Sequence, residues 1–375
     1  MKKNPTLFIT GGHVTPAIAL IEHLQKKDAW NIVFVGRKSA MEGDSAVSYE
    51  YKEISSRTIP FEPIVAGRVQ RTLTLYTFIS YLKIPVGFIQ SIFLFLKYRP
   101  DGVVSFGGYL AIPVVLAASL FRVPVITHEQ TTKPGLANRV IARIAKKVCV
   151  SWPGTETFFG EKAVLTGNPM RKDFFLDTEQ AVVQTTLPII YITGGSLGSH
   201  KINKAAKDII ENLVQTYTVV HQSGDSTLTT DYEDLQNIKN NLSKEFSSRY
   251  IVQPHFTAPE AAWLYKHATL VVSRSGANTI SELAYIGTPS ILVPLKIAGE
   301  NEQYHNALLL KKIGIAEILM EEDLSGEALF KLITSMVQHI HAYSKNKSAA
   351  RDLVIPDAVE RLSNVIDTSF TISNR

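Results

Sequence analysis

The chain is poor in the residues that mark several common classes of protein. Cys149 is the only cysteine among the 375 residues, which excludes a disulfide framework and a cysteine zinc site and is typical of a reducing compartment. There is no GxGxxG motif with a ribose-binding acid at the usual spacing, so an NAD-dependent dehydrogenase is a poor candidate. No Asp-x-Asp triplet occurs, so no carboxylate-bound metal or other cofactor is expected. No secretory signal is visible either.

Long apolar runs are also scarce, and the most conspicuous one is interrupted. Residues 73–96, LTLYTFISYLKIPVGFIQSIFLFL, include Lys83 and Pro85, which are expected to leave pieces too short to cross a bilayer as one helix. Basic residues flank this segment at Arg57, Arg68, Arg71, Lys97 and Arg99.

Two interpretations of this segment stay open. It is either an interfacial contact with an anionic leaflet or a buried helix pair of a first domain. Both hold if one helix face packs inward while the other meets lipid. If lipid contact occurs, charged substitutions at Phe88 and Phe95 are expected to abolish vesicle binding.

The overall composition and length are those of a globular protein with two domains. The chain is 45% hydrophobic and 19% charged, with a modest net charge of +5, and no nucleic-acid partner is expected. Its length suits two domains of about 170–190 residues each. We expect a first domain over 1–168, a linker over 169–188, a second domain over 189–352 and a C-terminal helix over 353–375.

The most informative stretch is residues 270–304, LVVSRSGANTISELAYIGTPSILVPLKIAGENEQY. It predicts a buried strand, a tight turn, a helix from about Asn278 to Gly287 and a second strand. The start of such a helix suits a phosphate or diphosphate, because its N–H groups are unpaired at the positive end of the helix dipole. Glu282, one helical turn further on, is placed to bind the two hydroxyls of a ribose. The stretch therefore predicts a nucleotide-diphosphate site.

A strand followed by a Gly-Gly turn occurs twice in the chain. Residues 7–12, LFITGG, recur nearly intact as residues 190–195, IYITGG, and helical patterns follow over 17–26 and 202–213. Paired glycines alone make only tight turns. Two copies in one chain nevertheless favour two Rossmann-like halves.

The rest of the chain alternates short strands and helices, which indicates an α/β fold with parallel sheets. Further strands are expected over 103–105, 123–127, 146–151, 163–166, 219–222 and 250–253. Helices are expected over 113–121, 258–267 and 356–370, and a polar surface excursion over 226–248.

Eight motifs occur in the order and spacing of one enzyme family: TGGHVTPAIAL, SFGGYLAIP, HEQTTKPGLANR, TGNPMR, TGGSLGS, HQSG, RSGANTISELAYIGTPSILVP and ENEQYHNA. On these motifs the chain resembles glycosyltransferase family 28, from residue 5 to about residue 365. The resemblance implies the GT-B fold, in which two Rossmann-like domains face each other across a cleft. The first domain would bind the acceptor and associate with the membrane, the second would bind UDP-GlcNAc, and the C-terminal helix would pack back on the first.

The resemblance also implies an activity. It is the inverting transfer of GlcNAc from UDP-GlcNAc to the muramoyl 4-hydroxyl of lipid I, undecaprenyl-diphospho-muramoyl-pentapeptide, which gives lipid II for peptidoglycan synthesis. The protein would work in the cytoplasm, peripherally on the inner face of the cell membrane.

Site residues follow from the same resemblance, position by position. The matching donor-side residues are Arg171, Ser196, Ala277, Asn278, Thr279, Glu282, Gln303 and Asn306. Among these, residues 277–282 would hold the diphosphate and ribose, and Ser196 would contact the phosphates. Gln303 and Asn306 would contact the GlcNAc hydroxyls. The matching acceptor-side residues are Thr10, Gly11, Gly12, His13, Tyr109, His128, Glu129 and Thr131.

The chain departs from the family pattern at a few positions. Phe8 and Ile9 stand where two further glycines are usual, and Thr131 stands where Asn is usual. Leu197 and Glu302 each replace a glutamine. These differences concern acceptor geometry and sugar contacts more than the class of reaction.

The chemistry of glycosyl transfer defines the roles that the site residues must fill. Inverting transfer needs an attacking hydroxyl, a base that takes its proton, and groups that hold the departing UDP. The helix start at 276–278 and the turn at 194–196 can replace a metal in that last task. His13 follows a strand end and has a near-neutral ordinary pKa, so it is the candidate base, although it could instead cap its loop. Glu129 is the competing base, and Glu302 an outside candidate.

Two other classes of function stay open. One is a related nucleotide-sugar enzyme, such as a UDP-GlcNAc 2-epimerase or a glycosyltransferase with another lipid acceptor. The basic-rimmed apolar segment argues against the epimerase, and HEQTTKPGLANR against a diacylglycerol glycosyltransferase. The other class is a non-catalytic nucleotide-binding scaffold, against which the joint presence of His13, Glu282 and Gln303 argues.

Overall fold

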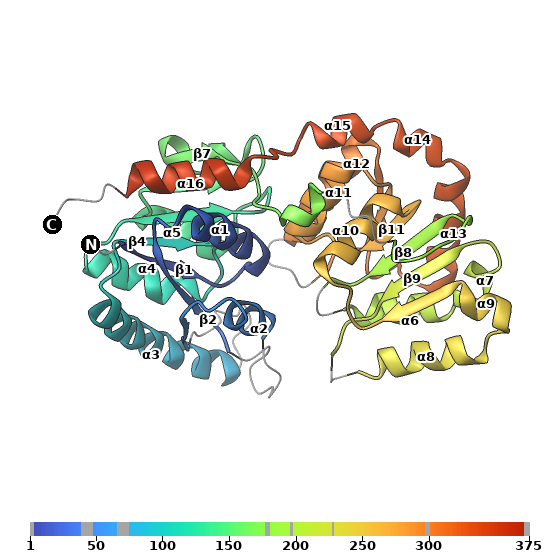
Figure 1. Ribbon diagram of the computed structural model, residues 1–375, viewed down its shortest axis with the longest axis horizontal. Coiled ribbons are helices and arrows are strands. Elements are labelled where there is room, and N and C mark those ends of the chain that lie inside the picture. The colour runs from blue at the N-terminus through green and yellow to red at the C-terminus, as the bar shows by residue number, and fades with distance from the viewer. Residues whose placement is uncertain are drawn as a thin grey trace. The chain divides into compact units, whose positions relative to one another are not determined.

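The chain folds into two compact units, each built on one parallel β-sheet (Figure 1). The computed structural model describes residues 4–38, 48–65, 75–176, 181–195, 198–226, 229–296 and 301–370, with the backbone alone at 49 and 75–84. Unit 1 comprises Met1–Met170 and Ile355–Arg375, and unit 2 comprises Arg171–Val354. Two Rossmann-like α/β domains are therefore present, as the sequence predicts.

The sheet of unit 1 reverses its strand order at the first strand. Its seven strands run in the order β3-β2-β1-β4-β5-β6-β7. Their bounds are β1 (Thr6–Thr10), β2 (Asn31–Gly36), β3 (Phe61–Pro63), β4 (Gly102–Ser105), β5 (Val125–Glu129), β6 (Lys147–Val150) and β7 (Ala163–Leu165). The chain moves outward from β1 through β2 and β3 and then returns to β4 on the other side of β1. In open parallel sheets, ligands bind at the carboxyl ends of the strands where this reversal occurs.

Helices cover both faces of this sheet. They are α1 (Val14–Lys27), α2 (Tyr49–Ser55), α3 (Leu75–Tyr98), α4 (Ala111–Leu120), α5 (Leu136–Ile144) and α16 (Ala358–Ser369), with short 3-10 turns η1 (Thr155–Phe158) and η2 (Gly160–Lys162). Because side chains alternate along a strand, Leu7 and Ile9 pack with α1 and α16, where Leu362 is buried. Phe8 packs on the opposite face with α3 and α4.

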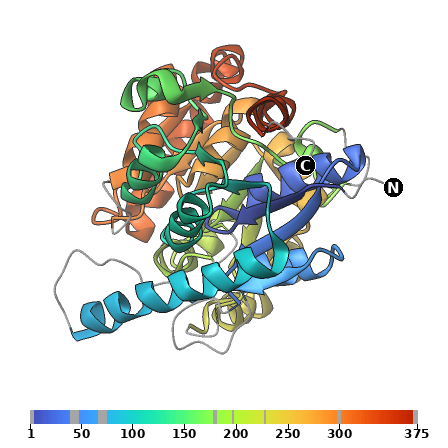
Figure 2. The same cartoon turned by 90° about the vertical axis from the view of Figure 1, so that its left-hand side faces the viewer.

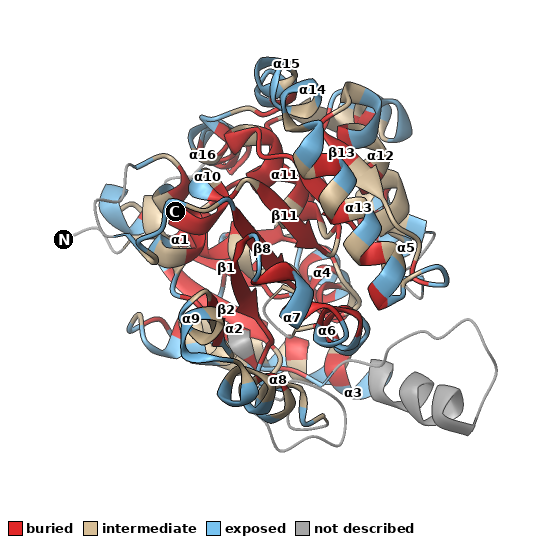
Figure 3. Cartoon of the chain, turned by 90° about the vertical axis from the view of Figure 1, so that its right-hand side faces the viewer, coloured by how far each residue is buried: buried red, intermediate tan, exposed pale blue. Residues whose placement is uncertain are grey.

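Unit 2 repeats this plan with six strands in the order β10-β9-β8-β11-β12-β13. They are β8 (Ile189–Thr193), β9 (Thr218–Gln222), β10 (Tyr250–Gln253), β11 (Leu270–Ser273), β12 (Ser290–Leu292) and β13 (Ala316–Ile318). The order reverses at β8, so the carboxyl ends of β8 and β11 mark the edge at which ligands bind in open parallel sheets. Figure 3 shows both strands as buried.

The helices of unit 2 begin with η3 (Lys172–Phe174), which lies in the expected linker and packs on α10. The others are α6 (His200–Lys207), α7 (Ile210–Leu213), α8 (Asp231–Asn241), α9 (Lys244–Ser248), α10 (Ala258–His267), α11 (Ala277–Ile286), α12 (Glu302–Ile313), α13 (Gly326–Gln338), α14 (Ile340–Ser344) and α15 (Lys347–Arg351).

The described part of the expected surface excursion over 226–248 does lie largely at the surface, but α8 and α9, which the sequence analysis did not expect, form much of it. Although the segment is mostly polar, α8 has a narrow apolar side. Leu235 on that side is 1% exposed and packs in the unit 2 core. Asp231, Glu233 and Asp234 lie in the first turn of α8, where acidic side chains stabilise a helix start. Ser243 caps α9 by accepting a hydrogen bond from the N–H of Phe246.

The expected interruption of the apolar segment was wrong, since α3 continues through Pro85 as one helix (Figure 2). Proline removes one backbone hydrogen bond and strains the preceding turn, but core packing holds the second half of α3. Phe95 is 2% exposed, and its ring lies edge-on to that of Phe8 at 5.3 Å between centroids. Among the described residues, no helix combines the length and the apolar character needed to cross a membrane.

Candidate active site

Two glycine turns meet at the reversal point of the unit 1 sheet. Gly12, after β1, has a φ of +132°, and a Cβ there would lie 2.5 Å from the carbonyl oxygen of Gly107. Gly107 and Gly108, after β4, have φ values of +77° and +74°. Such backbone conformations and so close an approach require glycine. The TGGH and FGGY motifs therefore form one backbone-to-backbone contact.

His13 lies at this contact, as the residue that precedes α1. It is partly exposed, but the surrounding protein desolvates its ring, and this burial lowers its pKa from 6.5 to about 4. The imidazole is therefore neutral near pH 7, which is the state in which it can accept a proton. Thr10, three residues before His13, is the last residue of β1 and is buried. Its hydroxyl has no hydrogen-bond partner among the described residues.

His128 on β5 is a second neutral imidazole in the same region. Burial lowers its pKa to about 4, with a smaller contribution in the same direction from the charge of His13. His128 Nε2 lies 2.8 Å from the carbonyl oxygen of Gly167 and must therefore carry the proton. Its Nδ1 has no hydrogen-bond partner among the described residues.

Glu129 follows His128 and is 2% exposed. One carboxylate oxygen accepts from the N–H of Thr131 at 3.0 Å and lies 2.7 Å from its hydroxyl, and the other accepts from the N–H of Gly135 at 3.2 Å and the amide of Asn138 at 2.9 Å. Burial raises the pKa of Glu129, and these hydrogen bonds oppose that shift. The carboxylate thus organises the loop that leads into α5, and Thr131 is part of the same arrangement.

Tyr109 is tied to a residue that the sequence analysis did not single out. Its hydroxyl accepts a hydrogen bond from Arg37 Nη1 at 2.8 Å, which joins the turn after β4 to the end of β2. Nothing in the local pattern marks Arg37, because its partner lies on a distant segment.

The second glycine turn, in unit 2, rests on the end of β9. A Cβ at Gly198 would lie 2.0 Å from the carbonyl oxygen of Ser223, so this position also requires glycine. Gln222 donates from Nε2 to the carbonyl oxygen of Gly195 at 3.0 Å. Two positions singled out in the sequence, Ser196 and Leu197, lie outside the described residues.

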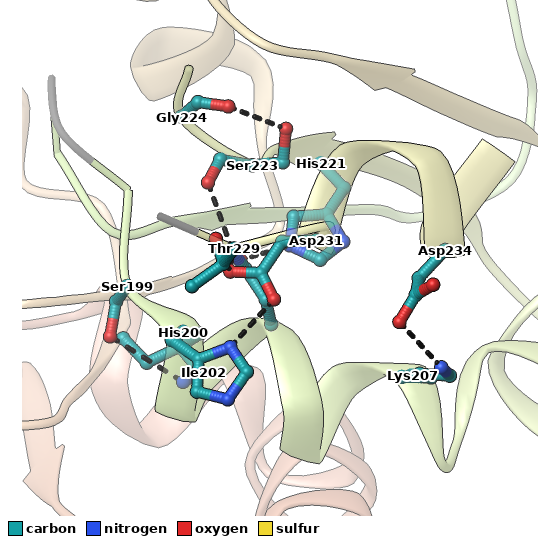
Figure 4. A network of polar contacts seen from close by, with 11 residues as sticks. Ser199, His200, Ile202, Lys207, His221, Ser223, Gly224, Thr229, Asp231 and Asp234 are labelled. Atoms are coloured by element: carbon teal, nitrogen blue, oxygen red, sulfur yellow. Dashed lines mark hydrogen bonds and ion pairs between the residues drawn. The ribbon is translucent and has the colours of Figure 1, made fainter. Parts of the chain in front are cut away.

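His221, in the HQSG motif, has a structural role beside this turn. His221 is fully buried, with Nε2 3.0 Å from Asn203 Oδ1 and Nδ1 3.1 Å from the hydroxyl of Tyr250. Burial lowers the pKa of His221 to about 3, so the ring is neutral. Asn203 also donates to Asp231 at 2.9 Å, and Asp231 lies 2.7 Å from Nδ1 of His200 (Figure 4). The network joins the starts of α6 and α8 to the end of β9.

Helix α11 starts as the sequence predicts, immediately after β11. Its cap residue is Gly276, which offers no side-chain hydrogen bond, and its first residues are Ala277, Asn278 and Thr279. The helix ends at Gly287 in the left-handed conformation with a φ of +77°. The start of such a helix is a favourable place for an anion, because the helix dipole is positive there.

Glu282, in the second turn of α11, is 5% exposed and lies 3.5 Å from Arg171 Nη2. Burial raises the pKa of Glu282, and the neighbouring guanidinium opposes this shift. The Arg171 guanidinium also lies over the ring of Phe174, 5.4 Å from its centroid. The structure thus brings together the two charged residues expected on the donor side.

Gln303 and Asn306, at the start of α12, are joined to the loop before α11. Ser275 donates from Oγ to the carbonyl oxygen of Gln303 at 2.8 Å and accepts from Asn306 at 3.4 Å. Gln303 Oε1 accepts from the N–H of Leu295 at 3.0 Å. The donor-side residues with described positions therefore gather at the carboxyl edge of the unit 2 sheet.

Both units match domains of a known enzyme family. The glycosyltransferase family 28 N-terminal domain matches residues 10–150, and the glycosyltransferase family 28 C-terminal domain matches residues 189–362. The UDP-N-acetylglucosamine–N-acetylmuramyl-(pentapeptide) pyrophosphoryl-undecaprenol N-acetylglucosamine transferase of Treponema denticola is 35% identical over 340 residues, which cover 87% of this chain and 86% of that protein.

Solved structures agree at the level of the fold. MurG from Acinetobacter baumannii superposes with a TM-score of 0.70 and 26% identity, covering 98% of this chain and 100% of that one. The UDP-GlcNAc 2-epimerase of Neisseria meningitidis, solved with UDP-GlcNAc, gives a TM-score of 0.62 at 12% identity, covering 96% of this chain and 99% of that one. At such low identity the second likeness shows the fold alone.

Proposed function

Because this chain belongs to glycosyltransferase family 28, we propose that it transfers GlcNAc from UDP-GlcNAc to the muramoyl 4-hydroxyl of lipid I and so forms lipid II. The glycine-capped start of α11, followed one turn later by the buried Glu282, is the observation that carries the donor assignment. The acceptor assignment is supported by the similarity to a transferase whose name states this reaction.

The donor would bind to unit 2. Backbone N–H groups at Ala277, Asn278 and Thr279 are suited to the diphosphate, since they lie at the positive end of the α11 dipole. The Glu282 carboxylate would accept from the ribose hydroxyls, with Arg171 holding it in place at 3.5 Å. Gln303 and Asn306 would contact the GlcNAc hydroxyls, with Ser196 at the phosphates.

The acceptor would bind to unit 1, and His13 would act as the base. The neutral imidazole takes the proton of the 4-hydroxyl as this oxygen attacks the anomeric carbon with inversion and UDP leaves. Glu129 would organise the acceptor loop, because both of its oxygens already accept hydrogen bonds from that loop. Tyr109, His128, Thr131 and the Thr10–Gly12 turn would line the acceptor side.

The N–H groups of α11 would also stabilise the departing UDP. Its diphosphate gains negative charge as the glycosidic bond breaks, and fixed N–H dipoles oppose that charge without reorganising. They would do here what a divalent cation does in other transferases. Among the residues that the structure describes, no group of three or more His, Cys, Asp or Glu side chains is arranged to hold a metal ion.

A peripheral contact with the inner face of the cell membrane would deliver the lipid acceptor. Unit 1 has exposed apolar side chains on three successive helices, Ile89, Phe93 and Leu96 on α3, Leu120 on α4 and Leu136 on α5, which we call the apolar face. Exposed cations lie on the same helices or directly beside them: Lys97, Arg99, Arg122 and Arg139. This combination favours an anionic leaflet. The expectation for Phe95 was wrong, since that ring is in the core.

The decisive experiment is an assay of UDP release from UDP-GlcNAc, with and without a short-chain lipid I analogue. We expect release only with the analogue, together with a lipid-linked disaccharide. Acceptor-independent formation of a 2-epimer would instead identify an epimerase. UDP binding without any turnover would identify a nucleotide-binding scaffold.

A further inference from the structure

A buried carboxylate occupies the turn between β1 and α1. Glu50, in the first turn of α2, is 6% exposed. A Cβ at Gly11 would lie 2.6 Å from its Oε2, and a Cβ at Gly36 would lie 2.9 Å from its Oε1. The carboxylate accepts a hydrogen bond from the backbone N–H of Arg37. Burial raises the pKa of Glu50, and the N–H groups of Arg37 and Gly12, together with the Arg37 charge, oppose this shift. The carboxylate therefore fills a space that exists because Gly11 and Gly36 have no side chains.

The helix that carries Glu50 is attached to β2 by other contacts. Ser48 donates from its N–H to the carbonyl oxygen of Lys38 at 2.8 Å, and its hydroxyl donates to the carbonyl oxygen of Arg37. The same hydroxyl caps α2 by accepting from the N–H of Tyr51 at 3.1 Å. These bonds attach α2 to the end of β2 independently of the Glu50 carboxylate.

Helix α1 lacks the features that usually stabilise a helix start. It has no acidic residue in its first turn, and His13 makes no side-chain capping hydrogen bond. A negative charge near a helix N-terminus is favourable, and Glu50 supplies one from a different segment. Its Oε2 lies directly against Gly11, in the turn that leads to His13. Through Arg37, whose guanidinium donates to Tyr109, it is linked to a second acceptor-side residue.

We propose that Glu50 is a positioning residue, whose carboxylate fixes the Gly11–Gly12 turn and thereby the imidazole of His13. This inference rests on the proposed function, in which His13 is the base. A displacement of about 1 Å in a reacting group costs on the order of 10²-fold in rate. Loss of the carboxylate is therefore expected to lower kcat by that factor, with little effect on the donor, whose residues are in unit 2.

The test compares Glu50→Ala and Glu50→Gln with Glu53→Gln. Glu53 is on the same helix, but its carboxylate pairs with Arg57 Nη1 at 2.8 Å, away from the glycine turn. We expect kcat to fall about 10²-fold in both Glu50 variants, with an unchanged KM for UDP-GlcNAc, and parental kinetics in Glu53→Gln. Parental kcat in Glu50→Ala, or an equal loss of donor affinity, overturns the proposal.

Chemical rescue separates positioning from general damage to the fold. Formate presents the same two acceptor oxygens and the same charge, and it is small enough for the space that Glu50→Ala leaves, whereas formamide is neutral and has only one acceptor oxygen. We expect formate, and not formamide, to raise kcat of Glu50→Ala by roughly tenfold, since charged acceptors bind backbone N–H groups most strongly. Equal rescue by both, or by neither, contradicts the inference.

A measurement without substrate keeps this inference separate from the proposed function. In NMR spectra of the ligand-free protein, the amide of Gly12 and the ring of His13 should shift in Glu50→Ala and return on addition of formate. If the parent protein fails to use a lipid I analogue while these shifts are seen, the proposed function fails and the positioning role stands. Unchanged signals in Glu50→Ala overturn the positioning role itself.

Discussion

His13 and Glu129 differ in how many of their polar atoms are already engaged. Both oxygens of Glu129 accept hydrogen bonds from its own loop, so removing a proton from a substrate would require it to abandon a partner. His13 is neutral, since its pKa is about 4, and its side chain does not cap α1. The loop-capping alternative for His13 is therefore not supported, and we retain His13 as the proposed base.

His13→Ala is expected to lower kcat by about 10²–10⁴, the usual contribution of general-base catalysis. UDP affinity should barely change, because the residues assigned to the donor are in unit 2. UDP release gives kcat, and calorimetry gives the affinity.

Glu129→Ala should lose less activity than His13→Ala but more thermal stability, because it leaves buried N–H donors without acceptors. A folded, inactive Glu129→Ala beside a near-parental His13→Ala would make the carboxylate the base.

The pH dependence of kcat/KM tests the environment of His13. A base must be neutral to act, so activity rises with pH through its pKa, and kcat/KM reports the free enzyme. The sequence alone predicts an ascending limb near the ordinary pKa of 6.5, but burial moves that pKa to about 4. We therefore expect kcat/KM to be flat above about pH 5.5 and to fall at lower pH. Phosphates of bound substrates should raise the pKa, so the limb in kcat should lie at higher pH. A limb that persists in His13→Ala would exclude His13 as its source.

At the scale of elements, the sequence predicted helices, strands and turns best where all the residues that determine them lie in one short segment. The strand, glycine cap, helix and terminal glycine of α11 follow one another in the chain, and the structure confirms this order from Leu270 to Gly287. The same holds for the two Gly-Gly turns. Each consists of an apolar run and a break, which need no knowledge of distant segments.

Prediction failed where the determining contacts are remote in sequence. Glu50 and Arg37 have no local pattern, and their importance comes from contacts with the Gly11–Gly12 turn and with Tyr109. Pro85 indicated a break in α3, yet the packing of Phe95 on Phe8 maintains the helix. Tertiary contacts of this kind override local propensity.

Glu282→Ala tests the donor assignment of α11. The carboxylate is 5% exposed and paired with Arg171 at 3.5 Å. If it accepts hydrogen bonds from the ribose, its loss should weaken UDP binding by about 1.5–3 kcal/mol, the range for hydrogen bonds to charged groups. Calorimetry measures this, with Glu233→Gln on the exposed side of α8 as the control. Unchanged UDP affinity in a folded Glu282→Ala would remove this residue from the site.

At the scale of the whole molecule, the two units share a plan and differ in their exposed surface. Each sheet reverses its order at its first strand and places a glycine turn there. Three successive helices of unit 1 expose large apolar side chains. Helix α16, at the end of the chain, belongs to unit 1 and packs on α1. These exposed apolar side chains are the reason why we assign the proposed membrane contact to unit 1.

The last prediction concerns this apolar face. Phe93 is 66% exposed, and transfer of a phenylalanine side chain from water is worth about 1.5–3 kcal/mol. Phe93→Glu, alone or with Ile89→Glu, should therefore weaken binding to anionic vesicles by roughly 10- to 100-fold and leave UDP affinity unchanged. Binding of the parent protein should also weaken at high salt, because exposed cations lie on the same helices or directly beside them.

Two further variants make this experiment specific. Leu176 is 55% exposed but belongs to unit 2, so Leu176→Glu should bind vesicles like the parent protein. Phe95 is 2% exposed within the unit 1 core, so Phe95→Glu should lower the melting temperature rather than act on vesicle binding alone. If Phe93→Glu binds vesicles like the parent protein, or if Leu176→Glu is impaired equally, the apolar face is not the membrane contact. The exposed side chains of α3, α4 and α5 would then need a protein partner to account for them.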